Sequence, residues 1–147
     1  MDPKSLVDRI DEKACLDFLS KMVQHKSHSE TEGEMVLARW MAAELAKIGV
    51  EAELQPFDDG RRFNTIGRLK GQGGGKSLLF NGHLDTNPVT EGWTVDPYAG
   101  LIDDKFIYGI GVSNMKAGDA AYFCAVKTLL EAGVKLKGDV IQTAPRN

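Results

Sequence analysis

The sequence predicts an α/β fold, a three-layer αβα sandwich built on a mixed sheet. Segments with the periodicity of strands alternate with segments that have the periodicity of helices, and no internal repeat interrupts them. The chain has 147 residues, 42% of them hydrophobic and 27% charged, enough for one domain with a core. We therefore expect residues 1–147 to form one unit with helices on both faces of the sheet.

Three segments carry apolar residues at the three-to-four spacing of an amphipathic helix. The second opens with the capping-box pattern Thr31-Glu32-Gly33-Glu34. Gly49 and Gly133 follow the second and third segments, as glycines commonly do at helix C-termini. The predicted helices are residues 5–24, 31–48 and 117–132.

The remaining regular segments have strand patterns. Residues 50–55 alternate apolar and polar side chains and end at Pro56, which predicts a strand near a sheet edge. Residues 77–80 form a short apolar run that is typical of a buried strand. Further strands are predicted at residues 63–69 and 139–144, and a hairpin at residues 98–102 and 106–109.

Composition excludes several classes of partner. Lys and Arg number 18 and Asp and Glu 21, and the net charge of −3 favours neither nucleic acid nor an anionic membrane. No apolar run approaches the roughly 20 residues that span a bilayer. Cys15 and Cys124 both lie in apolar helical patterns, where buried free thiols are common. These features predict a cytoplasmic protein in a reducing compartment.

A His-x-Asp motif follows the apolar run at residues 77–80. Side chains two apart on a strand face the same way, so Asp85 can orient the imidazole of His83. Carboxylates hold metal-binding histidines in this manner. The triplet alone also occurs by chance, with Asp85 capping a loop before Pro88.

The surrounding sequence makes the motif more specific. It reads Asn81-Gly82-His83-Leu84-Asp85-Thr86-Asn87-Pro88, then Trp93, then Asp96-Pro97-Tyr98, then Tyr108 to Lys116. This order resembles the zinc-dependent amidohydrolase and metallopeptidase family of acetylornithine deacetylase, succinyl-diaminopimelate desuccinylase, aminoacylase and glutamate carboxypeptidase. The resemblance runs from about residue 5 to residue 144. It implies that residues 1–147 are the N-terminal portion of a truncated, zinc-exopeptidase-like catalytic domain, without the lid and dimerisation domain.

The resemblance also implies site residues. His83 would be a metal ligand, Asp85 the catalytic-site acid that holds it, and Asn114 would occupy the place of an aspartate that bridges two zinc ions. A neutral amide is a poorer ligand than a carboxylate, so one or two ions, of zinc or cobalt, remain open. A cis peptide bond is expected between Asn114 and Met115.

For a full-length relative the resemblance implies metal-dependent hydrolysis of an amide bond in a small N-acyl amino acid or peptide, by a homodimer. Its general base and a further ligand would be a Glu-Glu pair after residues 139–144. This chain instead reads Pro145-Arg146-Asn147. We therefore expect the 147-residue chain alone to be inactive.

Two alternatives stay open. The chain could be a non-catalytic truncated remnant, or Gly109 to Asn114 could be an imperfect dinucleotide-binding fingerprint whose third glycine is Asn114. The remaining histidines, His25 and His28, match no ligand of the family and are predicted to lie in a solvated loop.

Overall fold

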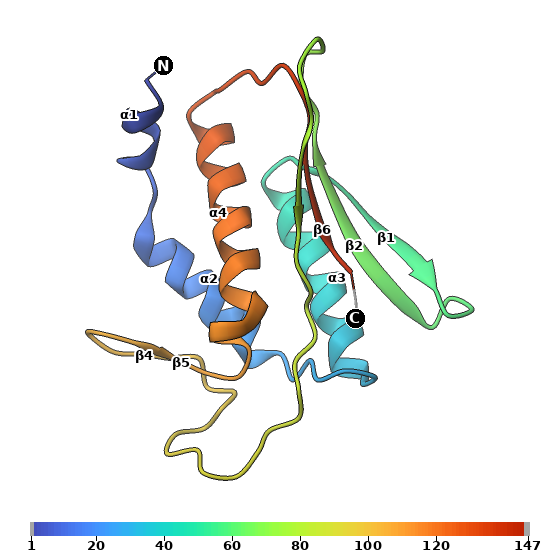
Figure 1. The fold of residues 1–147 in the computed structure, drawn as a ribbon, viewed down its shortest axis with the longest axis vertical. Coiled ribbons are helices and arrows are strands. Elements are labelled where there is room, and N and C mark those ends of the chain that lie inside the picture. Colours follow the sequence, from blue (N-terminus) through green and yellow to red (C-terminus); the bar gives the residue numbers. More distant parts are fainter. Residues whose placement is uncertain (1, 146–147) are drawn as a thin grey trace.

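The computed structural model describes residues 2–145 (Figure 1). Arg146 and Asn147, which stand where the acidic pair of the family was expected, lie outside these residues. The elements follow in the order α1 (Pro3–Val7), α2 (Glu12–Gln24), α3 (Glu32–Lys47), β1 (Glu51–Phe57), β2 (Arg62–Leu69), β3 (Leu78–Asn81), β4 (Leu101–Ile102), β5 (Ile107–Tyr108), the π-helical turn η1 (Val112–Lys116), α4 (Ala117–Glu131) and β6 (Val140–Ala144).

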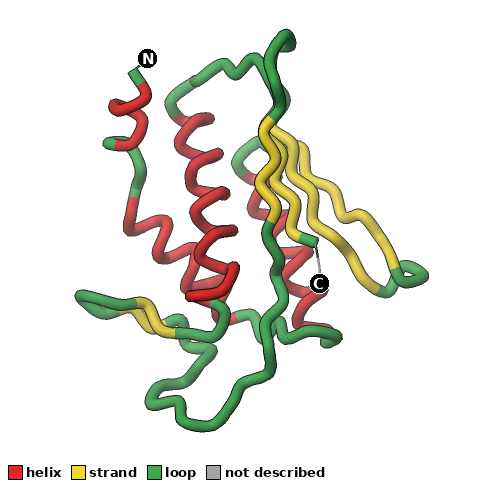
Figure 2. Tube along the Cα trace, viewed as in Figure 1, coloured by secondary structure: helices red, strands yellow, loops and turns green. Residues whose placement is uncertain are grey.

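Four strands form one mixed sheet in the order β1-β2-β6-β3 (Figure 2). The pairs β1–β2 and β2–β6 are antiparallel, whereas β3 and β6 are parallel. Parallel strands need a long crossover, and here it contains the β4–β5 hairpin and α4. The predicted α/β class and mixed sheet are confirmed.

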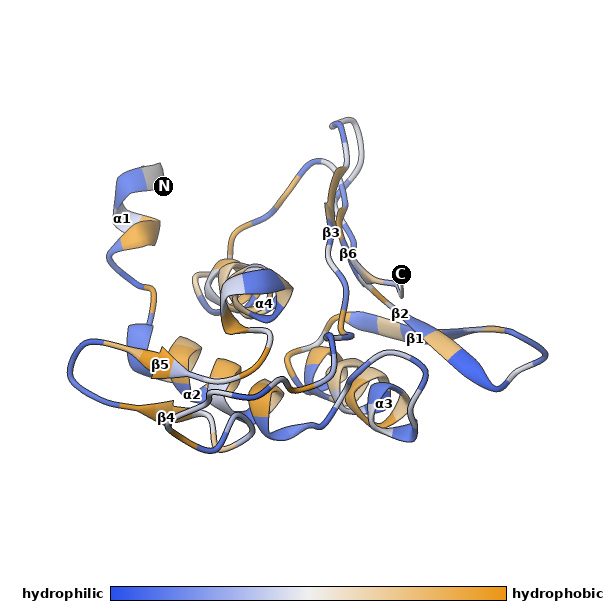
Figure 3. Cartoon of the chain, turned by 60° about the horizontal axis from the view of Figure 1, so that its bottom comes forward, coloured by the Kyte–Doolittle hydropathy of each residue, from blue (hydrophilic) through white to orange (hydrophobic). Residues whose placement is uncertain are grey.

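The helices lie on one side of this sheet (Figure 3). Thr65 on β2 donates from Oγ1 to the Ala38 carbonyl oxygen of α3 at 2.9 Å. At the other end of the sheet, the ring of Phe80 on β3 stacks on Tyr122 of α4 with centroids 4.4 Å apart. No helix of residues 2–145 covers the opposite face. The described chain thus supplies two of the three expected layers.

A continuous core fills the space between the sheet and the helices, and α2 joins it by packing on α4. The Phe18 and Phe123 rings stack with centroids 3.9 Å apart at this helix contact. Burying such side chains contributes about 25 cal/mol for each Å² of apolar surface removed from water. The described aliphatic residues with at most 2% exposure are Met22, Val23, Leu37, Ala38, Met41, Leu45 and Ala120.

The first predicted helix is wrong in its extent, because residues 5–24 form two helices. Helix α2 begins after Asp11, whose side chain accepts a hydrogen bond from the Ala14 backbone N–H at 2.9 Å. An aspartate with this contact is a helix N-cap, so its backbone is extended and cannot continue a helix from before it. Apolar residues continue at helical spacing across the break, but only those of α2 reach the core, and Val7 of α1 is 65% exposed.

The second predicted helix begins where expected, but its start is fixed differently from a capping box. Thr31 donates from Oγ1 to the His28 carbonyl oxygen instead of accepting from the helix. Glu34 accepts from the Glu30 backbone N–H, one position before the cap residue.

The prediction of a buried strand at residues 77–80 is wrong. β3 ends the strand order, and the Leu78 and Leu79 side chains are 52% and 57% exposed. An apolar run is buried only where layers cover both faces and strands flank both edges, and residues 2–145 do not provide this for β3. β1 also runs through Pro56 to Phe57, as an edge strand allows because one side of it needs no donors.

The other predicted elements agree with the structure. The β4–β5 hairpin is antiparallel but only two residues long on each side. Helix α4 and strand β6 lie within a residue of the predicted bounds. Across residues 2–145, no helix combines the length and the hydropathy that a membrane crossing requires.

Replacing Leu37, which is fully buried on α3, should lower the free energy of unfolding much more than replacing Leu79. Leu37→Ala leaves a cavity in the core and should cost about 2–5 kcal/mol. Leu79→Ala removes an exposed side chain and should cost under about 0.5 kcal/mol. Urea unfolding of both variants measures this difference. Equal costs would show that the open face of the sheet is covered.

Candidate metal site at the end of β3

The site begins where β3 ends, at Gly82. Its backbone N–H donates to the Thr143 carbonyl oxygen of β6 at 3.0 Å, which extends the parallel ladder by one residue. A Cβ atom on residue 82 would lie 2.1 Å from Oδ1 of Asp119 in the first turn of α4. Only glycine fits this close approach, which brings the chain onto the start of α4 immediately before His83.

His83 and Asp85 are in contact, as their spacing predicts. Nδ1 of His83 lies 3.1 Å from Oδ1 of Asp85 and 3.1 Å from the Asp85 backbone oxygen. Both oxygens can only accept, so the His83 Nδ1 atom carries the proton and Nε2 keeps its lone pair. The imidazole is half-buried and the carboxylate is buried. This geometry suits a histidine that binds a metal through Nε2.

A second segment, residues 27–29, holds the motif from the side. Ser29 donates from Oγ to Oδ2 of Asp85 at 2.6 Å. Ser27 is fully buried and donates from Oγ to the Leu84 carbonyl oxygen at 2.8 Å. The backbones pair as well, since Thr86 N–H donates to the Ser27 oxygen and Ser29 N–H donates to the Thr86 oxygen. Each oxygen of the Asp85 carboxylate therefore has a fixed donor.

This pairing corrects the prediction of a solvated loop for His25 and His28. Both residues are half-buried. The His25 ring packs on Trp40 with centroids 5.2 Å apart, and His28 forms the bridge to Thr86. Ser29 is a site residue that the sequence interpretation missed. Nothing in the local pattern marks it, because its partner Asp85 is 56 residues away.

Asn114 lies exposed in η1, the π-helical turn that leads into α4. Single π-helical turns at helix ends are frequent at functional sites. The turn lies beside the motif, because a Cβ on Gly111 would be 2.7 Å from the Thr86 methyl carbon. The cis peptide expected between Asn114 and Met115 is wrong: among residues 2–145 every peptide bond is trans.

Lys116 closes η1 and is almost fully buried, at 1% exposure. Its ammonium donates to the Met22 and His25 carbonyl oxygens at the end of α2, at 2.9 and 3.1 Å. Burial lowers the pKa of Lys116 to about 8. The carbonyls at a helix C-terminus lack partners within the helix and carry partial negative charge, so they are suitable acceptors for a buried cation.

Asp119, in the first turn of α4, is also buried, and neither of its carboxyl oxygens has a hydrogen-bond partner among the described residues. Burial raises the pKa of Asp119 to about 8. The carboxyl group is therefore largely protonated at neutral pH. The carboxyl group lies against the backbone of Gly82. Burying it there in its neutral form costs less free energy than burying it charged.

The described residues fit one corner of a metal centre. His83 offers a free Nε2 and Asp85 fixes its ring, but no three His, Cys, Asp or Glu side chains between residues 2 and 145 gather as a ligand set. Catalytic zinc usually has three protein ligands. The remaining ligands of such a centre would have to come from outside the described residues.

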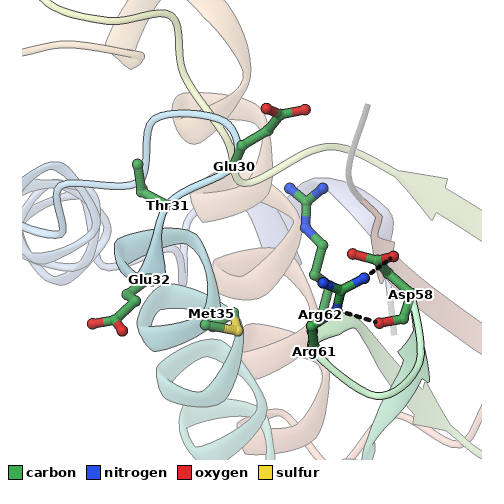
Figure 4. A pocket seen from close by; sticks show the side chains of 7 residues that line it. All are labelled: Glu30, Thr31, Glu32, Met35, Asp58, Arg61 and Arg62. Carbon is green, nitrogen blue, oxygen red and sulfur yellow. Dashed lines mark hydrogen bonds and ion pairs between the residues drawn. The ribbon is translucent and has the colours of Figure 1, made fainter.

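A hollow of about 390 Å³ lies elsewhere, between the start of α3 and the β1–β2 turn (Figure 4). Its two arginines are paired: Arg61 binds the Asp58 carboxylate at 3.0 Å and Arg62 binds Glu34 at 2.5 Å. Because carboxylates already neutralise these cations, the hollow has no free positive charge for an anion. None of the predicted site residues lines it.

Comparison with known proteins agrees with this arrangement. Residues 79–144, which contain the motif, η1, α4 and β6, match Peptidase family M20/M25/M40. Succinyl-diaminopimelate desuccinylase of Gluconobacter oxydans (strain 621H) is 45% identical over 102 residues, 68% of this chain and 26% of that protein. These two matches show that the chain belongs to Peptidase family M20/M25/M40, called the M20 family below. The predicted family resemblance is confirmed.

A second relative is similar over a larger share of the chain. N-formyl-4-amino-5-aminomethyl-2-methylpyrimidine deformylase of Bacillus subtilis (strain 168) is 35% identical over 118 residues, 76% of this chain and 26% of that protein. The chain thus spans about a quarter of the length of these two relatives.

Solved structures share the fold. Human carnosine dipeptidase 1 superposes with a TM-score of 0.83 over 96% of this chain and 34% of its own, at 20% identity. An M20 family metallo-carboxypeptidase of Sulfolobus solfataricus superposes with a TM-score of 0.73 over 98% of this chain and 30% of its own, at 22% identity. Both likenesses support the same α/β architecture.

The dinucleotide-binding alternative does not fit the M20 fold seen here. Its glycine pattern must follow a strand of a parallel sheet and open a helix. Gly109 instead follows β5, which pairs antiparallel with β4 in a separate two-stranded sheet. The strand that runs parallel before α4 is β3, and the His83 motif follows that strand.

Asp119 should make the chain less stable as the pH rises from about 4 to about 8. Its pKa near 8 in the folded chain lies above the unfolded value near 4, so the folded state holds a proton that the unfolded state has lost. The free energy of unfolding should fall by up to about 1.4 kcal/mol per pH unit in this window. Asp119→Asn cannot ionise and should remove that slope.

Urea unfolding of the native chain and Asp119→Asn at several pH values measures the difference. Subtracting one curve of unfolding free energy against pH from the other cancels the contributions of other titrating groups. His25 is one such group, because burial and the charge of Lys116 lower its pKa. Parallel curves for the two chains would contradict a buried, protonated Asp119.

Proposed function

We propose that this chain forms the first part of a metal-dependent enzyme that hydrolyses amide bonds. The observation that carries the proposal is the His83–Asp85 contact, which favours the tautomer with the proton on Nδ1 and leaves Nε2 for a metal. The motif lies at the end of a strand that is parallel to its neighbour β6, and ligands of open α/β sheets commonly bind at this end of strands.

The proposed roles follow the predicted site. His83 would ligate a zinc or cobalt ion, Asp85 would hold the ring, and Asn114 on η1 would stand at the position of a second ion. When bound, zinc polarises a carbonyl oxygen and acidifies water near neutral pH. This chain would contribute an oriented imidazole. Ser29 would keep the Asp85 carboxylate in place as a positioning residue.

The proposed substrate is a small N-acyl amino acid or a peptide. The two relatives described above are a succinyl-diaminopimelate desuccinylase and a deformylase of an N-formyl aminopyrimidine, and both names describe removal of an acyl group. Human carnosine dipeptidase 1 is named for cleaving a dipeptide. An amide carbonyl is common to all of these substrates. Homodimerisation and a cytoplasmic location remain expectations for the full-length protein.

For the 147-residue chain alone we propose no catalysis. The support is the donor set, since no three ligating side chains gather within residues 2–145. N-acetylornithine and N-succinyl-diaminopimelate, with release of the free amine as readout, test this directly. Zinc-dependent turnover by the chain that His83→Ala abolishes would contradict inactivity of the chain and would still support amide hydrolysis.

Zinc titration by calorimetry tests whether the metal site is present. With one protein ligand in place the native chain should bind zinc weakly, and His83→Ala should lose even this heat of binding, because Nε2 of His83 is the proposed ligand. His25→Ala is the matched control, since it removes a half-buried imidazole that packs on Trp40. It should bind zinc as the native chain does. Equal, negligible heats for the native chain and His83→Ala would remove the metal site.

Asp85→Asn should weaken zinc binding about 10- to 100-fold, which is the usual effect of losing the carboxylate that orients a ligating histidine. Asp104→Asn makes the same change on an exposed residue of the β4–β5 turn and should leave the affinity unchanged. The same calorimetric titration measures both variants. An unchanged affinity in Asp85→Asn would show that Asp85 does not hold a metal-binding ring.

A further inference from the structure

Glu34, in the first turn of α3, connects strand β2 to the loop beside the candidate site. One oxygen of its carboxylate, Oε2, accepts from Nη2 of Arg62 on β2 at 2.5 Å and from the backbone N–H of Glu30 at 3.1 Å. The Arg62 and Glu34 side chains are only 13% and 9% exposed. Since solvent hardly reaches this ion pair, salt screens it less than a pair at the surface.

We propose that Glu34 and Arg62 are positioning residues for the candidate metal ligand His83, and that they act by fixing the loop that carries Ser29. The ion pair works through this loop and not by contact with the imidazole. The role rests on the proposed function, in which His83 binds a metal.

The first link is the peptide bond between Ser29 and Glu30, whose N–H group is the one that Glu34 binds. Glu30 has a φ of 70°, in the left-handed region that residues with side chains rarely adopt. Such a conformation persists only where the surrounding contacts impose it. The Glu34 carboxylate supplies one such contact. The Thr31 hydroxyl, which donates to the His28 carbonyl oxygen at 2.7 Å, supplies another.

The second link runs from Ser29 to the imidazole. Ser29 directly precedes Glu30, so the orientation of the peptide between them sets where the Ser29 side chain points. The Ser29 hydroxyl donates to Oδ2 of Asp85 at 2.6 Å, and Oδ1 of the same carboxylate lies 3.1 Å from Nδ1 of His83. A rotation of the loop would remove one of the two donors that hold Asp85. The carboxylate would then turn, and the Nδ1 proton would lose its charged acceptor.

The ion pair is suited to fixing an orientation. A buried pair contributes little net stability compared with apolar side chains of similar size, because desolvation offsets the attraction between the charges. Removing one partner, however, leaves the other charge buried and uncompensated, so the two side chains stay together. Arg62 is also fixed on the sheet, where it pairs with Phe57 of β1 and its guanidinium lies 5.7 Å from the centre of the Phe57 ring. The pair thus transmits the position of β2 to the loop.

The test is the tautomer of His83 in the metal-free 147-residue chain, measured by long-range proton–nitrogen NMR at a pH where the ring is neutral. In Glu34→Ala and in Arg62→Ala the ratio of Nε2-protonated to Nδ1-protonated ring should rise about tenfold, the usual effect of losing one hydrogen bond to a charged group. Glu34→Gln keeps the shape of the side chain and should change the ratio in the same direction by less. Arg62→Lys keeps the charge and should give a ratio closer to that of the native chain than Arg62→Ala does.

Two control variants separate positioning from stability. Arg61→Ala removes the arginine that lies beside Arg62 and pairs with the Asp58 carboxylate (Figure 4). Leu45→Ala opens a cavity in the core near the end of α3, eleven residues after Glu34, and lowers the stability of the fold. Both variants should keep the tautomer ratio of the native chain.

The double variant Ser29→Ala/Glu34→Ala shows whether Glu34 acts through Ser29. It should have the tautomer ratio of Ser29→Ala alone, because that change already breaks the link. Effects of the two changes that add on a logarithmic scale would overturn the proposal. So would the native ratio in folded Glu34→Ala and Arg62→Ala, or an equal rise in Leu45→Ala. The predicted ratios together with a native chain that binds no zinc would support the positioning of His83 and remove its proposed role as a metal ligand.

Discussion

The buried ammonium of Lys116 is the interaction on which the arrangement of the candidate site depends. It connects the end of α2, through the Met22 and His25 carbonyls, to the turn that carries Asn114. A buried cation without acceptors is costly, whereas carbonyls at a helix C-terminus lower that cost. The turn η1 is consequently held between α2 and the motif, and α4 starts from a fixed point.

The motif itself is held from three directions. β6 fixes Gly82 by a ladder hydrogen bond, residues 27–29 pair with residues 84–86, and Asp119 of α4 lies against Gly82. These contacts place the Asp85 carboxylate between two donors, Ser29 and the His83 ring. In the proposed role, a histidine held this firmly would need little reorganisation to bind a metal, which is the usual advantage of a preorganised site.

Much of the fold and half of the site could be predicted from the sequence. Local spacing of residues was enough to predict three features: the alternation in β1, the bounds of α4 and the His83–Asp85 contact. Ser29 and the position of β3 depend on pairings between distant residues, which local patterns do not encode. The break before α2 was missed because apolar spacing continues across it, although the Asp11 cap marks it.

The central claim is that Asp85 fixes the His83 ring with Nδ1 protonated and Nε2 free. Long-range proton–nitrogen NMR spectra, recorded at a pH where the His83 imidazole is neutral, measure this tautomer directly. The signal that is lost in His83→Ala belongs to His83. The structure predicts that the His83 imidazole carries its proton on Nδ1, as the 3.1 Å contact with Asp85 requires. A His83 ring protonated on Nε2, or one that averages between the two tautomers, would contradict it.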